Sequence, residues 1–363
     1  MGSPEKPYPA ILLPGAYGKI DYSLIMEDLI DAVAAFEVYK EKMRDSRAKM
    51  SWIVSLQQNE ALKSSMLEGT QATLDGVLVN QIIPDDSNAN LNEVSNYFDA
   101  AVQGQTLLKR GDFDDDFFCS IHKTLLSGKV RKNLGEIGKY RAKQNYIGTN
   151  DNTITFTPPK PDDVPALMEN LIDFMNSPDE TLRPLVQVAI IHAQFETIHP
   201  FSDGNGRVGR MLIPLYLYAH GELKSPYFFI SEALEQDKYK YYGYLMGIRE
   251  KGEWTQWIQF FLQTVAKQCR KFVSQFDKIE QLYRTDLQKA QDFTRSSKYV
   301  EKILNTMFEY PVFNAALMCE KTGIPLATVN RYLNLFTDNK ILYKDQKKRN
   351  RMFFYYNLLE LIR

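Results

Sequence analysis

The chain has 363 residues, of which 44% are hydrophobic and 25% are charged, and its formal net charge is −1 at pH 7. This length predicts two or three folding units, and the composition is that of an ordinary globular protein. The near-neutral charge excludes a general affinity for nucleic acid or membrane surfaces and leaves only local patches open.

The cysteines and the N-terminal residues indicate in which cellular compartment the protein is expected. Cys119, Cys269 and Cys319 are scattered and odd in number. They are expected to be buried small hydrophobic residues in a reducing environment, not disulfides or a zinc site. The first residues lack the apolar stretch of a signal peptide, and no apolar run reaches membrane-spanning length. The expected location is therefore cytoplasmic, with no membrane partner.

The N-terminal third is predicted to be an extended arm followed by helices. Residues 7–18 are rich in Pro, Gly and Leu, which indicates an arm laid over another surface. Helices are expected over 22–43, over 50–67 with Gly69 ending it, over 90–107, and over 117–126 after an acidic run at 112–116. Their apolar positions are Leu24, Leu29, Val33 and Phe36 in the first and Leu91, Val94, Phe98 and Val102 in the third.

A β-hairpin is predicted before the centre of the chain. Residues 144–148 and 153–157 are β-prone runs, and the turn-rich segment 149–152 separates them. Pro158 and Pro159 would end the second strand. From the residues alone, an edge hairpin with no role and a functional hairpin remain equally open.

Helical signals dominate the rest of the chain. Helices are expected over 164–175, 185–198, 207–219 and 239–249, and a long helix runs from Trp254 past Leu282, a strut between domains. His192 lies seven residues before His199 and is expected to be structural.

After Ser296 the pattern changes. Three short helices, 299–308, 314–321 and 326–336, precede two β-prone runs, 341–343 and 352–356, around the basic turn 347–350. This order resembles a winged helix. Duplex DNA contact through Thr328, Asn330, Arg331 and the basic turn is one interpretation. Protein contacts or homodimer formation is the other, and the net charge favours it.

The most informative segment is residues 199–210, His-Pro-Phe-Ser-Asp-Gly-Asn-Gly-Arg-Val-Gly-Arg. Glycines let backbone N–H groups approach phosphate oxygens, and a helix that follows adds partial positive charge. Arg207 and Arg210 would share a helix face, Asp203 can hold a divalent metal, and His199 is a candidate general base. The run therefore suits a polyphosphate. Asp-Gly-Asn-Gly alone would be ordinary turn chemistry. The run is not a P-loop, since no Gly-Lys-Ser/Thr follows.

The run resembles the signature of Fic domain proteins, His-x-Phe-x-Asp-Gly-Asn-Gly-Arg-x-x-Arg, most of which transfer AMP from ATP to a protein hydroxyl. All eight specified positions match: His199, Phe201, Asp203, Gly204, Asn205, Gly206, Arg207 and Arg210. A branch that phosphorylates instead has Ala-Asn-Lys in this turn and lacks the second arginine. Gly204, Gly206 and Arg210 disfavour that branch.

The resemblance implies a site that binds the nucleotide ATP together with Mg²⁺. It would comprise residues 203–210, including Val208 and Gly209, with the metal on Asp203 between the α- and β-phosphates. The hairpin would be a flap that clamps the target protein by strand addition, which places Asn145, Tyr146, Ile147 and Gly148 near the nucleotide. One ring of the pair Tyr241 and Tyr242 would stack on adenine; which one is left open. His199 would take the proton from a target Tyr, Thr or Ser hydroxyl that attacks the α-phosphorus.

A regulatory motif is implied as well. Ser64 to Gly69 matches the Ser/Thr-x-x-x-Glu-Gly/Asn inhibitory motif of Fic proteins, here N-terminal to the core. The resemblance implies that Glu68 pairs with Arg210, the arginine that would bind the γ-phosphate. ATP would then bind unproductively. Without the resemblance, a glutamate before a glycine is a solvated helix end.

The expected fold is mainly α: a Fic helical core with a β-hairpin flap, plus a C-terminal winged-helix-like domain. The expected divisions are residues 1–110 (arm and helices, including the inhibitory helix), 111–270 (catalytic core), 271–295 (linking helix) and 296–363 (winged-helix-like domain). Two rival functions remain: a hydrolase that removes AMP from modified proteins with Glu68 orienting water, and a DNA-binding regulator that uses the Fic site as a sensor.

Overall fold

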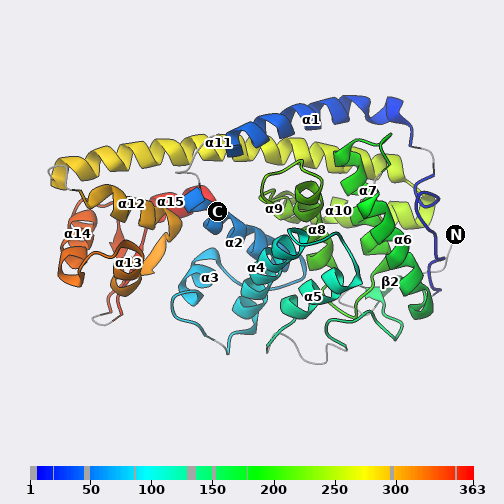
Figure 1. Cartoon of the computed structure of the whole chain (residues 1–363), viewed down its shortest axis with the longest axis horizontal. Helices are drawn as coiled ribbons and strands as arrows, with labels where there is room; N and C mark the ends of the chain where they lie inside the picture. Colours follow the sequence, from blue (N-terminus) through cyan, green and yellow to red (C-terminus); the bar gives the residue numbers. More distant parts are fainter. Residues whose placement is uncertain are drawn as a thin grey trace.

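The structure is a computed structural model that describes residues 6–18, 20–44, 50–85, 87–128, 136–148, 153–177, 179–294, 298–347 and 350–363. The fold is mainly helical, with two small antiparallel sheets. Figure 1 shows the long helix α11 (Trp254–Thr294) along one side of the molecule, with α1 (Tyr22–Arg44) beside it. The remaining elements lie on one side of this pair, and α11 extends past both the helices around α8 and the C-terminal elements.

Helix α1 packs on α11 through a face that differs in part from the predicted one. Leu29 and Phe36 are buried as expected, together with Ile25, Ala32, Ala35 and Tyr39. Leu24 and Val33 are exposed, so their assignment to the buried face was wrong. The buried face is set by tertiary packing, because α11 covers the side of α1 that carries Ile25, Leu29, Ala32 and Phe36.

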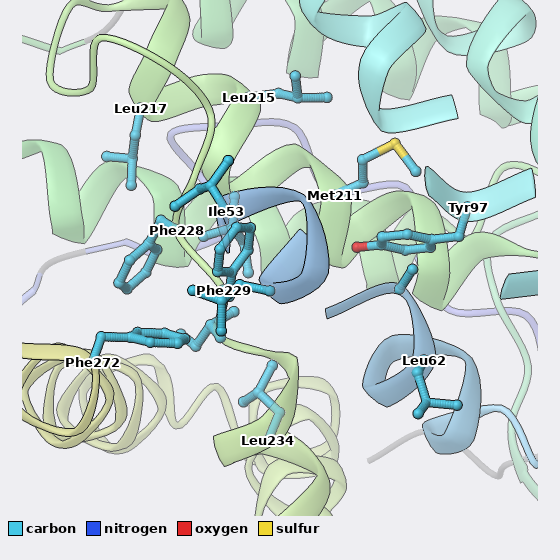
Figure 2. Packing of buried hydrophobic residues seen from close by; sticks show 14 of the residues in the cluster. Ile53, Leu62, Tyr97, Met211, Leu215, Leu217, Phe228, Phe229, Leu234 and Phe272 are labelled. Atoms are coloured by element: carbon cyan, nitrogen blue, oxygen red, sulfur yellow. The ribbon is translucent and has the colours of Figure 1, made fainter. Parts of the chain in front are cut away.

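The core holding the site is built from five helices: α2 (Met50–Leu67), α4 (Ala89–Leu108), α5 (Asp115–Leu125), α7 (Pro184–Ile198) and α8 (Asn205–Ala219). Every residue of α7 from Leu185 to Ile198 is buried, so this helix is surrounded on all sides. Figure 2 shows the side chains of α2, α4 and α8 that meet in this core, among them Ile53, Leu62, Tyr97, Met211 and Leu215. Their packing fixes α2 against α8.

The predicted face of α4 needs a correction. Val94 is buried, but Leu91 and Phe98 are only half-buried and Val102 is exposed. The buried positions are Glu93, Val94, Tyr97, Ala100 and Gly104. At Gly104 an added Cβ would lie 2.8 Å from a methyl group of Leu215. Close approach to α8 therefore leaves no room for a side chain at Gly104.

The hairpin consists of β1 (Ile147–Gly148) and β2 (Ile154–Phe156), which pair antiparallel. Its predicted tip, residues 149–152, lies outside the described residues. The predicted helices α6 (Val164–Asn176) and α10 (Lys238–Lys251) are confirmed. Helices α3 (Leu74–Asn80) and α9 (Ser231–Gln236) and the short 3₁₀ turn η1 (Pro161–Asp163) were not predicted, since none is long enough to show a helical period.

The N-terminal arm lies over another surface, as predicted. The N–H of Tyr8 donates to the carbonyl of Thr157 (2.9 Å), and the side chain of Gln194 donates to the carbonyl of Ile11 (2.9 Å). The backbone of Leu13 exchanges two hydrogen bonds with the side chain of Asn170. The arm therefore connects the end of the hairpin to α6 and α7.

The C-terminal part contains α12 (Val300–Glu309), β3 (Val312–Asn314), α13 (Ala315–Thr322), α14 (Leu326–Asp338), β4 (Tyr343–Lys344), β5 (Met352–Phe354) and α15 (Tyr356–Ile362). The three helices were predicted, but β3 and α15 were missed. The strands form a sheet of order β3-β5-β4. Assignment of this part to the winged-helix class stays a prediction, and Lys348 and Arg349 of the basic turn lie outside the described residues.

This C-terminal part packs directly on α2. The rings of Trp52 and Phe308 lie 6.0 Å apart, and the side chain of Asn59 donates to the carbonyl of Ile362 (3.0 Å).

Among the cysteines only Cys269 is fully buried, while Cys119 and Cys319 are half-buried, so the expectation of three buried thiols was wrong for two. None of the described helices is long and apolar enough to span a membrane.

Candidate active site

The motif residues form the connection between α7 and α8. His199 ends α7 in the left-handed region (φ 50°), and Gly204 begins α8 in the same region (φ 79°). A left-handed backbone is unusual for a histidine and natural for a glycine. The two reversals turn the chain sharply between two buried helices, which presents residues 199–206 at the helix ends.

Hydrogen bonds hold this loop in one conformation. The side chain of Asn205 accepts from the N–H of Phe201 and donates to its carbonyl, both at 2.8 Å. His122 stacks on the Phe201 ring at 3.8 Å, and its Nδ1 accepts from the N–H of Gly138 (2.9 Å). The proton therefore sits on Nε2, which donates to the carbonyl of Asp203 (3.0 Å). Burial lowers the pKa of His122 to about 4, which keeps this arrangement neutral.

The segment before the hairpin also holds the loop. Arg141, only 3% exposed, donates through Nε to the carbonyl of His199 (2.9 Å) and through Nη2 to that of Pro159 (2.5 Å). Its own N–H donates to the carbonyl of Pro200 (2.9 Å). The amide of Asn145 donates to the carbonyl of Phe201 (3.0 Å). Asn145 thus contacts the motif loop, and its predicted place near the nucleotide stays a prediction.

His199 is suited to accept a proton. Its Nδ1 lies 3.3 Å from the carbonyl oxygen of Glu196 and 3.9 Å from a carboxylate oxygen of the same residue. A proton on Nδ1 directed at that carbonyl leaves Nε2 as the basic nitrogen. Burial, followed by the charge of Arg249, lowers the pKa of His199 to about 3, so the ring is neutral at physiological pH. The side chain keeps 19% of its surface exposed.

Asp203 and Arg207 lie next to each other at the start of α8. The carboxylate of Asp203 accepts from the N–H of Gly204 (2.6 Å) and keeps 26% of its surface exposed. Arg207 is fully buried and lies 3.8 Å from both Asp203 and Glu93. Within the part of the chain that the structure describes, no three His, Cys, Asp or Glu side chains converge on a common point. Asp203 is therefore a partly exposed carboxylate at this turn, and a bound cation would have to complete its ligand set from other sources.

The second arginine is engaged by the end of α2. Arg210 donates through Nε to the hydroxyl of Ser64 (2.9 Å) and through Nη2 to the Ser64 carbonyl (2.8 Å) and to Glu68 Oε1 (2.6 Å). Burial acts to raise the pKa of Glu68, but the charge and hydrogen bond of Arg210, together with the charge of Arg207, outweigh it, so the pKa lies below its ordinary value. Glu68 is thus an ionised carboxylate on a buried guanidinium.

Two glycines of the motif make room for carboxylates. A Cβ on Gly206 would lie 2.3 Å from Glu68 Oε1, and one on Gly209 would lie 2.4 Å from Glu196 Oε1. Val208 is fully buried, and the carbonyl of Gly209 accepts from His192. The contribution of Val208 and Gly209 to nucleotide binding stays a prediction, and the Val208 side chain faces the core. His192 is buried beneath the site, as expected.

The tyrosine pair divides into two environments. Tyr241 is fully buried, and its hydroxyl lies 2.9 Å from His192 Nε2. Tyr242 is 41% exposed, and its hydroxyl donates to the carbonyl of Leu67 (3.3 Å), next to Glu68. Only Tyr242 has a face available for stacking on a purine.

The remaining predicted nucleotide residues, Tyr146, Ile147 and Gly148, lie in or beside β1, and Tyr146 is 55% exposed.

Sequence reasoning missed the residues that support the loop. His122 and Arg141 contact the backbone of the α7–α8 connection, and Glu196 lies beside the His199 ring. Arg249 donates to the carbonyl of Glu196 in the last turn of α7. None of them belongs to the run 199–210. The only available signal was the position of Glu196 one helical turn before His199, which puts both on one face. For Arg141 and Arg249 the sequence carries no such spacing.

The comparisons agree with this geometry. Two family models match the chain: "Fic/DOC family" over residues 112–217 and "Fic/DOC family N-terminal" over residues 26–106. The helical fold, the α7–α8 turn and the motif define a Fic-type site. The chain belongs to the Fic/DOC family.

Relatives match over part of their length. A "Protein adenylyltransferase Fic" of Aedes aegypti is 32% identical over 166 residues, 45% of this chain and 30% of that protein. One of Nematostella vectensis is 30% identical over 189 residues, 50% of this chain and 41% of that protein. This chain thus matches less than half the length of either.

Solved structures share the fold. A Fic family protein from Desulfovibrio desulfuricans superposes with a TM-score of 0.60 at 20% identity, over 93% of this chain and 97% of its own. Fic-1 from Caenorhabditis elegans superposes with a TM-score of 0.52 at 20% identity, over 71% and 74% of the two chains.

Proposed function

We propose that this protein is a nucleotidyltransferase that moves AMP from ATP to a Tyr, Thr or Ser hydroxyl of a target protein. The observation that carries the proposal is a neutral, partly exposed His199 on the same turn as Asp203 and two buried arginines. A base and a phosphate-binding surface on one turn suit an in-line attack on a phosphorus atom. The names of the relatives, protein adenylyltransferases, support the same activity.

Each residue would have one role in the reaction. The turn at Gly204–Gly206 and the first N–H groups of α8 would bind the phosphates together with Arg207. His199 Nε2 would accept the proton of the target hydroxyl while its oxygen bonds to the α-phosphorus and pyrophosphate leaves. Developing charge on the leaving group would be stabilised by Arg207 and Arg210. Tyr242 would stack on the adenine.

Mg²⁺ would be held by Asp203. Its partly exposed carboxylate fits, because Mg²⁺ is usually held by one or two carboxylates plus the oxygens of a bound phosphate substrate. The ion would neutralise charge on the α- and β-phosphates. Asp203 is kept in place for this role by the N–H of Gly204.

Glu68 would keep the enzyme inhibited. Its carboxylate occupies the Nη2 group of Arg210, which a γ-phosphate would otherwise engage. ATP would then bind with its phosphates displaced from the in-line geometry. Glu68 could also orient a water for the reverse reaction, removal of AMP from a modified protein, because its low pKa keeps it ionised.

The partners follow from the elements around the site. The hairpin β1–β2 would hold a target segment by strand addition. The C-terminal part would contact duplex DNA or mediate homodimer formation, with the protein at work in the cytoplasm. The exposed side chains of Asn330 and Arg331 on α14 are available for either partner.

Label from ATP separates the activities. ATP labelled at the α-phosphate should modify protein, and ATP labelled at the γ-phosphate should not. Mass spectrometry of a lysate after incubation would identify the modified residue. Transfer of the γ-label would contradict the proposal, and release of AMP from a modified protein without transfer would favour the hydrolase.

A further inference from the structure

Arg249 of α10 connects the hairpin to the base. Its guanidinium lies 4.1 Å from the centre of the Phe156 ring in β2, a cation–π geometry. Its Nη2 donates to the carbonyl of Glu196 at 2.9 Å. That same carbonyl is the one His199 Nδ1 approaches at 3.3 Å. One side chain thus contacts both the hairpin strand and the acceptor that orients the imidazole.

Arg141 makes a second connection between the same two parts. It donates to the carbonyl of Pro159, three residues after β2, and to the carbonyl of His199 itself. The guanidinium is planar and rigid, so the two acceptors are held at a set separation. A weaker contact of 3.4 Å reaches the carbonyl of Ile198. The hairpin is therefore joined to the end of α7 twice, by arginines from different segments.

We propose that Arg141 and Arg249 are positioning residues that join the hairpin to the α7–α8 turn, so that a target segment held by the hairpin meets His199 at a set distance. The inference rests on the proposed transferase function. Neither arginine needs to touch the nucleotide for this role. An error of about 1 Å in the position of a reacting group can cost on the order of 100-fold in rate.

The surroundings of His199 are consistent with this role. The charges of Arg249 from α10, Arg141 before the hairpin and Glu68 after α2 act on the ring, and the backbone carbonyl of Glu196 lies 3.3 Å from its Nδ1. The two arginines favour the neutral ring, whereas Glu68 and the Glu196 carbonyl favour the protonated one. Loss of either arginine therefore both frees the turn and brings the pKa of His199 closer to its ordinary value.

A double-mutant cycle on the full chain tests the link from both ends. Arg249→Gln should lower kcat for transfer by about 10- to 100-fold, with the KM for ATP within about twofold. Phe156→Leu removes the ring from the hairpin side and should lower kcat as well. The double variant should be no more than about twofold slower than Arg249→Gln alone, because the two changes break one link. Effects that multiply would overturn the shared link.

Hydrogen exchange gives a readout that needs no activity. In Arg249→Gln and Arg141→Lys, amides 153–157 and 196–199 should exchange faster, while α4 stays unchanged. Lys240→Gln is the matched control, since this side chain on α10 is 70% exposed and pairs only loosely with Asp237 at 3.6 Å. Unchanged exchange in both arginine variants would refute the proposal. If exchange changes as expected but the parent chain transfers no AMP, the proposed function fails and the structural link stands.

Discussion

Replacement of Glu68 by glycine is expected to activate the protein. The carboxylate makes a 2.6 Å bond to Arg210 Nη2, while Ser64 holds Nε and the other bond of Nη2. Removal of Glu68 leaves the guanidinium tethered by Ser64 and opens its outer edge. Arg210 Nη1, which has no hydrogen-bond partner among the described residues, would then be available with Nη2 for a γ-phosphate.

The magnitude follows from the type and exposure of the contact. A hydrogen bond between charged groups contributes about 1.5–3 kcal/mol when shielded from water. Glu68 keeps 27% of its side-chain surface exposed, so the lower part of that range, roughly 1.5–2 kcal/mol, is appropriate. At about 1.4 kcal/mol per tenfold, transfer should rise roughly 10- to 30-fold.

The assay is incorporation of label from α-labelled ATP into the protein itself and into lysate proteins. Gln71→Gly, a change at an exposed position three residues later, is the matched control for added backbone freedom. The double variant Glu68→Gly with Arg210→Ala should lose the gain, because the released arginine is its cause. Equal incorporation by Glu68→Gly and the parent chain, or a gain that survives Arg210→Ala, would refute the reasoning.

Three further predictions test other parts of the site. His199→Ala should reduce the rate of AMP transfer by about 100-fold or more, because the general base is removed. Its affinity for ATP, measured by calorimetry, should stay within a few-fold, because the base acts on the target hydroxyl. Full activity of this variant would exclude His199 as the base. Because the pKa of His199 is lowered to about 3, kcat should not fall as the pH decreases through 6.5. Activity should be lost only as the pH approaches that lower pKa. A decrease of kcat centred near pH 6.5 would contradict this prediction. Gly209→Ala should lower the free energy of unfolding by about 1–3 kcal/mol in denaturant titration, because its Cβ would collide with Glu196. Gly243→Ala on α10 is the control and should not lower the free energy of unfolding, because nothing lies within 4 Å of an added Cβ there. Equal effects of the two changes would contradict the close approach at Gly209.

Salt dependence distinguishes the two possible partners of the C-terminal part. If Lys347 and Arg351 contact phosphates, duplex DNA binding should weaken steeply between low and moderate salt in an anisotropy titration. No binding to any duplex at low salt would leave the protein-contact interpretation.

Several features were determined by the sequence itself. The run 199–210 marks the turn because its characteristic residues are recognisable by their own backbone or side chain: a glycine at a positive φ, a histidine as the proposed base, and a carboxylate and arginines as charges. The long helices were also predictable, since periods such as those in α2 and α11 extend over many turns. Even the contact between Glu68 and Arg210, 142 residues apart, was anticipated, although only through resemblance to Fic proteins.

Other features were decided by the tertiary structure alone. Which stripe of α1 or α4 is buried depends on the shape of α11 and α8, and no local period contains that information. Whether Tyr241 or Tyr242 remains accessible depends on the packing of α10 against α7. Arg141 and Arg249 meet the α7–α8 turn from segments about 50 residues to either side of it. Their partners are backbone carbonyls, which every residue carries, so the sequence offers no residue type by which such contacts can be recognised.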